Sequence, residues 1–326
     1  MTRVGVVIPT LDGRDLLEEC LPPLLHASAS AGQPVEVLVV DNGSRDGTRE
    51  WLAREHPEFG VLSLPENEGF STAVNRGIRK LDTPLVLCLN NDVAVEADFL
   101  PPLVDGLQDP SVFSLSPRIT LEGDPRFDEA VTRGRMKDGA LVIEQPGGPG
   151  ENRSDPMPVL FGVGAAVMVR RAYFLDLGGF DPTFEPYYCE DMDLSIRAWR
   201  RGWRVLYSPA SRVRHRHRAT IDRLHRPQER ETFKWANHEL LQWRHLRGSP
   251  AAAAYLGGLV ARARDAFVAG RRDLLVSFAF AFERLTELPP DWGRDVLARV
   301  SLEEALRRSN LPQSEDQRRD PTTASS

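Results

Sequence analysis

The sequence has few cysteines and no long apolar run, and both shortages exclude classes of protein. Cys20, Cys88 and Cys189 are scattered over 326 residues and form no CxxC pair, so a disulfide framework is excluded. A reducing, cytoplasmic location is therefore expected. The apolar run at the amino terminus is too short for a signal peptide, and no run reaches the length of a membrane span. The chain is expected to be soluble, and contact with the inner face of a membrane remains open.

Two common nucleotide-binding fingerprints are also missing. PTLDG stands after the first apolar run, where a dinucleotide-binding fold would carry GxGxxG, and the P-loop pattern GxxxxGK[ST] does not occur. Ordinary NAD binding and kinase-type ATP binding are therefore not expected. The net charge of −6 gives no electrostatic reason to expect nucleic acid as a partner.

What the sequence does contain, from residue 4 to about residue 121, is an alternation of short apolar runs with segments of helical spacing. Apolar runs of this length are typical of strands covered on both faces. The alternation predicts an α/β fold with a mainly parallel sheet flanked by helices. A further buried strand is expected over residues 161–169, and two more over residues 203–207 and 212–217.

Polar, glycine-rich turns follow four successive predicted strands. The strand at residues 85–89 ends in Asn90, Asn91 and Asp92, and the turns after the other three share this chemistry: PTLDG, DNGSRDG and NEGF. Each turn taken singly is ordinary, and Asp92 alone reads best as a turn or cap residue. Four in succession favour a nucleotide held at the carboxyl edge of the sheet.

A second group of acids opens a later helix. Glu190, Asp191 and Asp193 precede an apolar face formed by Met192, Ile196 and Trp199. Acids in a first helical turn are favoured by the helix dipole, so their position alone requires no catalytic role.

Five phrases in order resemble the family 2 glycosyltransferases of the GT-A fold, especially the bacterial rhamnosyltransferase-like branch: VVIPTLDG, VLVVDNGSRDGT, NEGFSTAVNRGI, LCLNNDV and YYCEDMDLSIRAWRRGW. The resemblance covers about residues 4–220. It implies an inverting, non-processive transfer of rhamnose or another hexose from a dTDP- or UDP-sugar, with Mg²⁺ or Mn²⁺. The acceptor would be a hydroxyl on a glycan, a lipid-linked or a small molecule, in the synthesis of a cell-surface polysaccharide or glycoconjugate.

The resemblance also implies roles for single residues. Asp191 corresponds to the catalytic base, and Asp92 and His215 correspond to metal ligands, although the usual DxD is reduced here to NND. The usual Asn after the first strand is Asp12. The residues expected at the nucleotide sugar are Pro9, Asp12, Asp41, Asn67, Gly69, Asn75, Asn90, Asn91 and Glu190.

The chemistry of such a transfer is consistent with so few acids. A departing diphosphate needs its charge neutralised, and a divalent cation on hard oxygen ligands does this as a Lewis acid. Because the cation replaces a general acid, one carboxylate suffices as the base that takes the acceptor's proton. An imidazole ligand would favour Mn²⁺. His215 and His217 lie in an arginine-rich stretch, however, and a surface histidine that binds no metal is an equally good interpretation of this position.

The expected division of the chain has three parts. Residues 1–222 would form the catalytic domain, with a long, irregular, flexible loop at 122–158 that acts as a lid. Residues 223–311 would form helices at 229–246, 251–269, 273–285 and 292–308. Three roles remain for these helices: packing on the core, a homodimer contact or a peripheral membrane contact. The tail at 312–326 would be disordered. Two alternative functions also remain: transfer to a polyprenyl phosphate, and binding of a nucleotide sugar or glycan without turnover.

Overall fold

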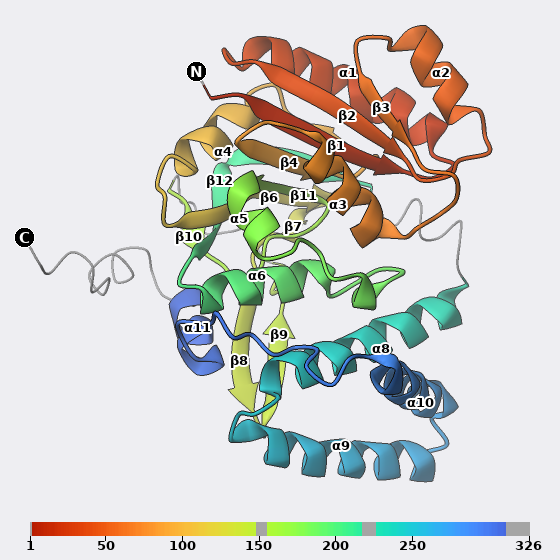
Figure 1. Cartoon of the computed structure of the whole chain (residues 1–326), viewed down its shortest axis with the longest axis vertical. Helices are drawn as coiled ribbons and strands as arrows, with labels where there is room; N and C mark the ends of the chain where they lie inside the picture. Colours follow the sequence, from red (N-terminus) through yellow and green to blue (C-terminus); the bar gives the residue numbers. More distant parts are fainter. Residues whose placement is uncertain (1, 148–154, 217–225, 311–326) are drawn as a thin grey trace, which may run out of the picture.

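The computed structural model describes residues 2–147, 155–216 and 226–310 of the chain. Ten strands within these ranges form one sheet, with a layer of helices around it and a group of carboxyl-terminal helices below (Figure 1). The path through the sheet is β10-β12-β6-β11-β4-β1-β2-β3, while β5 pairs with β12 and β7 pairs with β6. His217 and the tail at 312–326 lie outside the described residues.

Most strands of the sheet run parallel, as the alternating pattern predicted. Strands β1, β2, β3 and β4 pair in parallel, β12 pairs in parallel with β6, and β11 runs antiparallel between β4 and β6. The bounds are β1 Val4–Thr10, β2 Val35–Asp41, β3 Gly60–Ser63, β4 Leu85–Leu89, β5 Val93–Val95, β6 Val112–Leu121, β7 Asp124–Asp128, β10 Met157–Pro158, β11 Ala166–Arg170 and β12 Arg204–His215.

The register of the parallel strands fixes where their polar ends lie. Thr10 at the end of β1 pairs with Asp41 at the end of β2, and Val7 pairs with Cys88 of β4. The segments that follow these strands therefore leave the sheet at one edge. This edge is where ligands bind in open α/β sheets.

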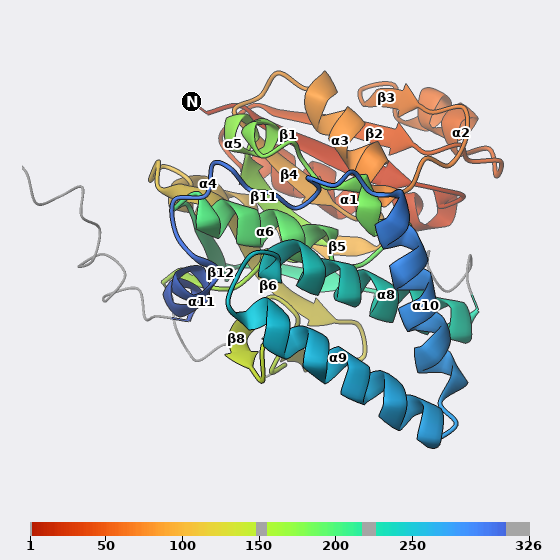
Figure 2. The ribbon, with the colours of Figure 1, turned by 60° about the horizontal axis from the view of Figure 1, so that its bottom comes forward.

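Helices cover the sheet and extend beyond it. In the first part of the chain they are α1 Arg14–Ser30, α2 Thr48–Glu55, α3 Phe70–Lys80, α4 Leu100–Gly106, α5 Arg171–Asp176, the 3₁₀ helix η1 Pro182–Phe184 and α6 Glu190–Arg200. The carboxyl-terminal helices are α8 Pro227–Leu246, α9 Ala251–Val268, α10 Arg272–Glu287 and α11 Leu302–Ser309, and the turned view shows α8 below α6 (Figure 2). Within the described ranges, none of these helices combines the length and apolarity that crossing a bilayer requires.

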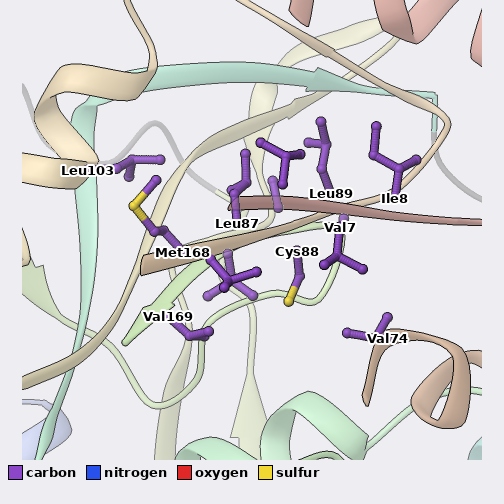
Figure 3. Packing of buried hydrophobic residues seen from close by; sticks show 14 of the residues in the cluster. Val7, Ile8, Val74, Leu87, Cys88, Leu89, Leu103, Met168 and Val169 are labelled. Atoms are coloured by element: carbon purple, nitrogen blue, oxygen red, sulfur yellow. The ribbon is translucent and has the colours of Figure 1, made fainter. Parts of the chain in front are cut away.

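The main core lies around β4, which is buried along its whole length. Leu87 and Cys88 point to opposite sides of the strand, Leu87 on the side of Met168 and Leu103, and Cys88 close to Val7 (Figure 3). Both faces of the strand are thus covered by apolar side chains, which explains why its sequence is continuously apolar and not alternating.

The described part of the segment at 122–158, residues 122–147 and 155–158, is largely regular, contrary to expectation. It contains β7 and a hairpin of β8 Arg133–Lys137 and β9 Ala140–Glu144, which extends from the sheet toward the carboxyl-terminal helices (Figure 1). Asp138 and Gly139 form its turn with φ values of 51° and 78°. An Asp-Gly pair is a strong hairpin signal, but the polar, glycine- and proline-rich stretches on either side of the hairpin favoured an irregular loop, although Leu141 to Ile143 are apolar. That the segment moves as a lid stays a prediction.

Three smaller expectations were wrong in part. Residues 161–165 form a turn before β11 and not the start of a strand. The two strands expected at 203–207 and 212–217 are one strand, β12, with a register shift between Ser208 and Arg212. Residues 292–300 are not helical, because Gly293 is left-handed with a φ of 79° and the N–H groups of Arg299 and Val300 donate to the Arg200 carbonyl.

The core around β4 gives a direct stability prediction. Replacing Leu87, which is fully buried, by Ala should lower the free energy of unfolding by about 2–5 kcal/mol, because a cavity remains between tightly packed neighbours. Val61→Ala on the edge strand β3, where the side chain is 38% exposed, should change it by less than about 1 kcal/mol. Urea unfolding followed by circular dichroism measures both, and equal losses would contradict the assignment of the core.

Candidate active site

A cavity of about 280 Å³ opens at the edge of the sheet where β1 and β4 end. The first turn of α6 also lines it, so residues near position 10 and residues near position 190, which are far apart in the sequence, meet there. The structure brings together nine of the residues that the sequence singled out: Pro9, Asn67, Gly69, Asn90, Asn91, Asp92, Glu190, Asp191 and His215. In particular, Asp92 and Asp191 face one shared cavity.

Asp92 and His215 lie side by side on the wall of this cavity. The Nε2 atom of His215 is 3.3 Å from Oδ1 of Asp92, and its Nδ1 atom is 2.7 Å from Oε2 of Glu129. Burial lowers the pKa of His215, but the hydrogen bonds to Asp92 and Glu129 outweigh it and raise the pKa to about 9. The imidazole is therefore held between two carboxylates.

Glu129 was missed by the sequence reasoning, because it belongs to the segment expected to be irregular. The return of the chain along β6 brings it to the cavity, where its backbone N–H donates to the Ile119 carbonyl at 2.9 Å. Asp128 anchors the same turn, since the Tyr207 hydroxyl donates to its carboxylate at 2.7 Å. An acidic pair in a polar loop carries no periodic signal, so only the fold could show that Glu129 holds His215.

The donor set of Asp92 and His215 suits a divalent cation only with further ligands. Within the residues that the structure describes, no group of three or more His, Cys, Asp or Glu side chains could hold a metal ion. One carboxylate and one imidazole leave coordination positions that diphosphate oxygens would fill. The residues present thus fit a cation that binds together with a diphosphate and that displaces the Nε2 proton of His215, which the raised pKa otherwise keeps in place near neutral pH.

Asparagine side chains shape the rim beside Asp92. Nδ2 of Asn91 donates to Oγ1 of Thr10 at 2.9 Å and so joins the ends of β4 and β1. Oδ1 of Asn67 accepts from Nδ2 of Asn42 at 2.9 Å and from the Gly69 N–H at 3.0 Å. Asn42 was not among the predicted site residues, although it lines the cavity. These contacts fix the turns after three strands in one arrangement.

Gly69 occupies a place that no other residue could take. Its φ is 87°, and a Cβ atom there would lie 2.2 Å from the Glu185 carboxylate. That carboxylate accepts from the N–H groups of Phe70 and Thr72 at the start of α3. The glycine therefore allows the cavity wall and the loop before α6 to approach closely.

Three predicted residues do not line the cavity described here. Oδ1 of Asp12 accepts from the Arg45 N–H at 2.6 Å, and Oδ1 of Asp41 accepts from the Ser44 N–H at 3.0 Å. Both contacts hold turns together. Asn75 is buried and makes two hydrogen bonds to the backbone of Phe180, which tie α3 to the loop after α5. Nucleotide contact stays a prediction for these three.

Asp191 reaches the cavity from the first turn of α6. Its Oδ2 accepts from the Gly164 N–H at 2.9 Å, and its Oδ1 accepts from the Met192 N–H at 2.8 Å. Burial raises the pKa of Asp191 to about 6, although both hydrogen bonds act in the opposite direction. A carboxylate with such a pKa is a stronger base than an exposed aspartate and is still ionised near neutral pH.

Glu190 lies beside Asp191 and is almost fully buried. Burial and the charge of Asp191 raise its pKa well above the usual value. Its Oε2 has no hydrogen-bond partner among the residues of the described ranges, and the side chain lines the cavity. A buried carboxyl oxygen in this position can bind a hydroxyl group of a ligand.

A buried ion cluster lies under the helix that carries Asp191. The Asp193 carboxylate is bound by Arg197 of the same helix at 2.7 Å, by Arg244 of α8 at 2.6 Å and by His245 at 3.0 Å. The pKa of Asp193 lies far below its usual value, because the two guanidinium groups and His245 outweigh the effect of its burial. The cluster therefore fixes α6 to the carboxyl-terminal helices.

The chain matches proteins of known activity. A family model described as glycosyl transferase family 2 matches residues 5–178, more than half of the chain. The N-acetylglucosaminyl-diphospho-decaprenol L-rhamnosyltransferase of Mycobacterium tuberculosis is 31% identical over an alignment of 216 residues, and the match covers 59% of this chain and 70% of that protein.

Two solved structures resemble the fold. GalNAc-T7 with UDP, GalNAc and Mn²⁺ has a TM-score of 0.56 and 18% identity over 74% of this chain, which spans about half (47%) of that protein. The mannosyltransferase PcManGT from Pyrobaculum calidifontis, in complex with GDP-Man and Mn²⁺, has a TM-score of 0.51 and 19% identity, covering 88% of this chain and 76% of that one. At such identities the likeness concerns the fold, and it confirms the expected GT-A architecture.

The ion cluster gives a stability prediction. Asp193→Asn should lower the free energy of unfolding at pH 7 by about 3–5 kcal/mol, because the buried Arg197 and the largely buried Arg244 lose their carboxylate. Asp273→Asn, which breaks an exposed pair with Arg271, should change it by less than about 1 kcal/mol.

The pH dependence of the same variant tests the cause. Since the pKa of Asp193 is lowered, its stabilising contribution is present above the pKa of an unfolded aspartate and disappears only as the pH falls toward the lowered value. The difference between wild type and Asp193→Asn should therefore not become smaller from pH 8 to pH 5 in urea unfolding, although protonation of His245 in the wild type can enlarge it. A difference that disappears already between pH 8 and pH 5 would contradict the ion pairing.

Proposed function

This chain belongs to glycosyl transferase family 2, and we propose that it transfers a hexose, with inversion, from a nucleotide diphosphate sugar to an acceptor hydroxyl. The observation that carries the proposal is the shared cavity of Asp92 and Asp191. One carboxylate follows a buried strand beside an imidazole, and the other stands at a helix start with a raised pKa. A single displacement needs one group that takes the proton of the acceptor and another that neutralises the departing diphosphate. We assign the first role to Asp191 and the second to a cation at Asp92.

The two ends of the cavity have different tasks. A divalent cation held by Asp92 and His215 would neutralise the negative charge of the departing diphosphate. Asp191 takes the proton of the acceptor hydroxyl as this oxygen attacks the anomeric carbon, from the face opposite the diphosphate. The hydrogen bond from Gly164 keeps Oδ2 in place, and Glu190 binds a hydroxyl of the sugar. One attack from the opposite face inverts the configuration.

The donor we propose is a dTDP- or UDP-linked rhamnose or other hexose, and the metal is Mg²⁺ or Mn²⁺. Support comes from the mycobacterial relative, which is named a rhamnosyltransferase, and from the solved structures that contain UDP or GDP-Man with Mn²⁺. His215 beside Asp92 favours Mn²⁺ over Mg²⁺, because imidazole is a softer ligand than oxygen.

The acceptor we propose is a lipid-linked sugar at the inner face of the membrane, as the name of the mycobacterial relative suggests. Exposed apolar side chains at the end of α9 support a peripheral contact: Phe267 is 75% exposed and Val268 is 79% exposed, next to Arg271. In this arrangement residues 1–222 carry the transfer and residues 223–311 bring the cavity to its acceptor. A homodimer through the carboxyl-terminal helices is the alternative use of the same surface.

Replacing Asp191 by Asn tests the base. Transfer should fall by a factor on the order of 10³, because the amide cannot accept the proton, while the affinity for nucleotide sugar with Mn²⁺ should stay within about threefold. Product formation and isothermal titration calorimetry measure the two quantities. Asp105→Asn on the exposed side of α4 is the matched control and should transfer at the wild-type rate.

The pH profile of the wild type belongs to the same test. Because the base acts in its ionised form and the pKa of Asp191 is raised to about 6, the rate should fall as the pH decreases through about 6. Unchanged transfer by Asp191→Asn would remove the base and favour a phosphate acceptor, which needs no strong base. A wild type that binds the donor and never transfers would favour a binding protein.

Metal removal tests the other end of the cavity. Chelation with EDTA should abolish transfer, and Mn²⁺ should restore it at lower concentration than Mg²⁺. Asp92→Asn should weaken Mn²⁺ binding, in the presence of the nucleoside diphosphate, by about 10-fold or more. Electron paramagnetic resonance of free Mn²⁺ measures this binding without turnover. Full transfer in the presence of EDTA, or unchanged Mn²⁺ affinity in Asp92→Asn, would contradict the proposal.

A further inference from the structure

The turn that precedes α6 has an unfavourable backbone. Tyr188 and Cys189 are both left-handed, with φ values of 73° and 77°. For residues with a Cβ atom this conformation is disfavoured, and two in succession persist only where the surroundings hold them. Cys189 is the residue directly before α6, so its conformation sets the direction in which Glu190 and Asp191 leave the turn.

A single side chain from α8 binds the carbonyl groups of this turn. Nδ2 of Asn237 lies 2.6 Å from the Phe184 carbonyl, 2.8 Å from that of Tyr187 and 3.2 Å from that of Tyr188. An amide nitrogen carries two hydrogens, so the two short contacts are full hydrogen bonds and the third is shared. Asn237 is completely buried, so bulk water does not compete with its amide for these carbonyl groups.

The orientation of this amide is fixed from its other side. Nη1 of Arg284, on α10, donates to Oδ1 of Asn237 at 2.5 Å. A guanidinium group only donates, so the oxygen must face Arg284 and the nitrogen must face the turn. Two carboxyl-terminal helices therefore act together on the segment 184–188.

Apolar packing supports the same contact. Phe184 and Cys189 are buried against Leu240 and Leu241 of α8 in one cluster. The ring of Tyr187 meets Phe233, also on α8, edge to face at 5.8 Å. The side chain of the left-handed Cys189 is thus enclosed, and a change to another backbone conformation would expose it.

We propose that Asn237 is a positioning residue for the transfer: it holds the turn at 184–189 in its left-handed form and thereby places the carboxylate of Asp191 in the cavity. This inference rests on the proposed function, in which Asp191 is the base. Asn237 lies beyond residues 5–178, which the family model matches, and it touches the turn and not the cavity. Without the amide, three carbonyl groups lose their donor and the start of α6 can turn away from Gly164.

The test compares three variants. Asn237→Ala removes the donor, and Arg284→Met keeps the donor but frees its orientation. Gln242→Ala is the matched control, because Gln242 is a buried amide on the same helix that makes two hydrogen bonds to the backbone of Leu141 and none to the turn. For each variant the rate of transfer, the donor affinity with Mn²⁺, the melting temperature and the hydrogen exchange of amides 187–192 are measured.

Asn237→Ala should lower kcat by a factor on the order of 100, with donor affinity unchanged within about threefold, because a base displaced by an ångström loses most of its effect. Arg284→Met should also lower kcat, but by a smaller factor. Amides 187–192 should exchange faster in both Asn237→Ala and Arg284→Met. Gln242→Ala should lose thermal stability while its kcat and the exchange of these amides stay near wild type.

Equal losses of kcat in Asn237→Ala and Gln242→Ala would overturn the inference, since they would reflect a general loss of stability. If Asn237→Ala does not fold, Arg284→Met decides, and wild-type kcat with wild-type exchange in that variant would overturn it. A wild type that transfers no sugar would refute the proposed function separately. In that case hydrogen exchange still tests whether Asn237 holds the turn at 184–189. Unchanged exchange of amides 187–192 in Asn237→Ala would overturn the inference, and faster exchange would support it.

Discussion

The parallel pairing of β1 with β2 and β4 is the constraint on which the rest of the molecule depends. It aligns Thr10 with Asp41 and brings the segments after β1, β2 and β4 to one edge of the sheet. Because both faces of β4 are covered, its polar residues can only appear where the strand ends, at Asn90 to Asp92. The hydrogen bond from Asn91 to Thr10 then joins these ends into one cavity wall. The place of Asp92 thus follows from the burial of the strand before it.

The second half of the site depends on contacts that are distant in sequence. Asp191 stands on α6, which is fixed by the buried Asp193 cluster below and by the Asn237 contact to the preceding turn. Both attachments come from α8, so the carboxyl-terminal helices belong to the framework of the cavity as well as to the surface of the molecule. Glu129 adds a third distant contribution, because the segment after β6 returns to hold His215. The cavity is therefore built from, and held by, parts of the chain that lie far apart in sequence.

Much of the fold could be predicted from the sequence, because buried strands and amphipathic helices leave periodic patterns. The strand that ends before Asn90 and the helix that begins at Glu190 were both found in this way. The hairpin at Arg133 to Glu144 was missed, since β8 is largely polar, the apolar run of β9 is short, and only Asp138-Gly139 marks the turn. Glu129 and Asn237 could not be found at all. Their function is a contact with a distant residue, and such a contact leaves no local trace in sequence.

The central claim is that a cation at Asp92 and the base Asp191 face the two ends of one donor sugar. Crystals soaked with Mn²⁺ and a non-hydrolysable nucleotide sugar, measured for anomalous scattering, test it most directly. The account predicts a manganese peak in contact with the Asp92 carboxylate and His215 Nε2, with the anomeric carbon between the metal-bound diphosphate and Asp191. A manganese peak away from Asp92, or an anomeric carbon whose free face is turned away from Asp191, would contradict it.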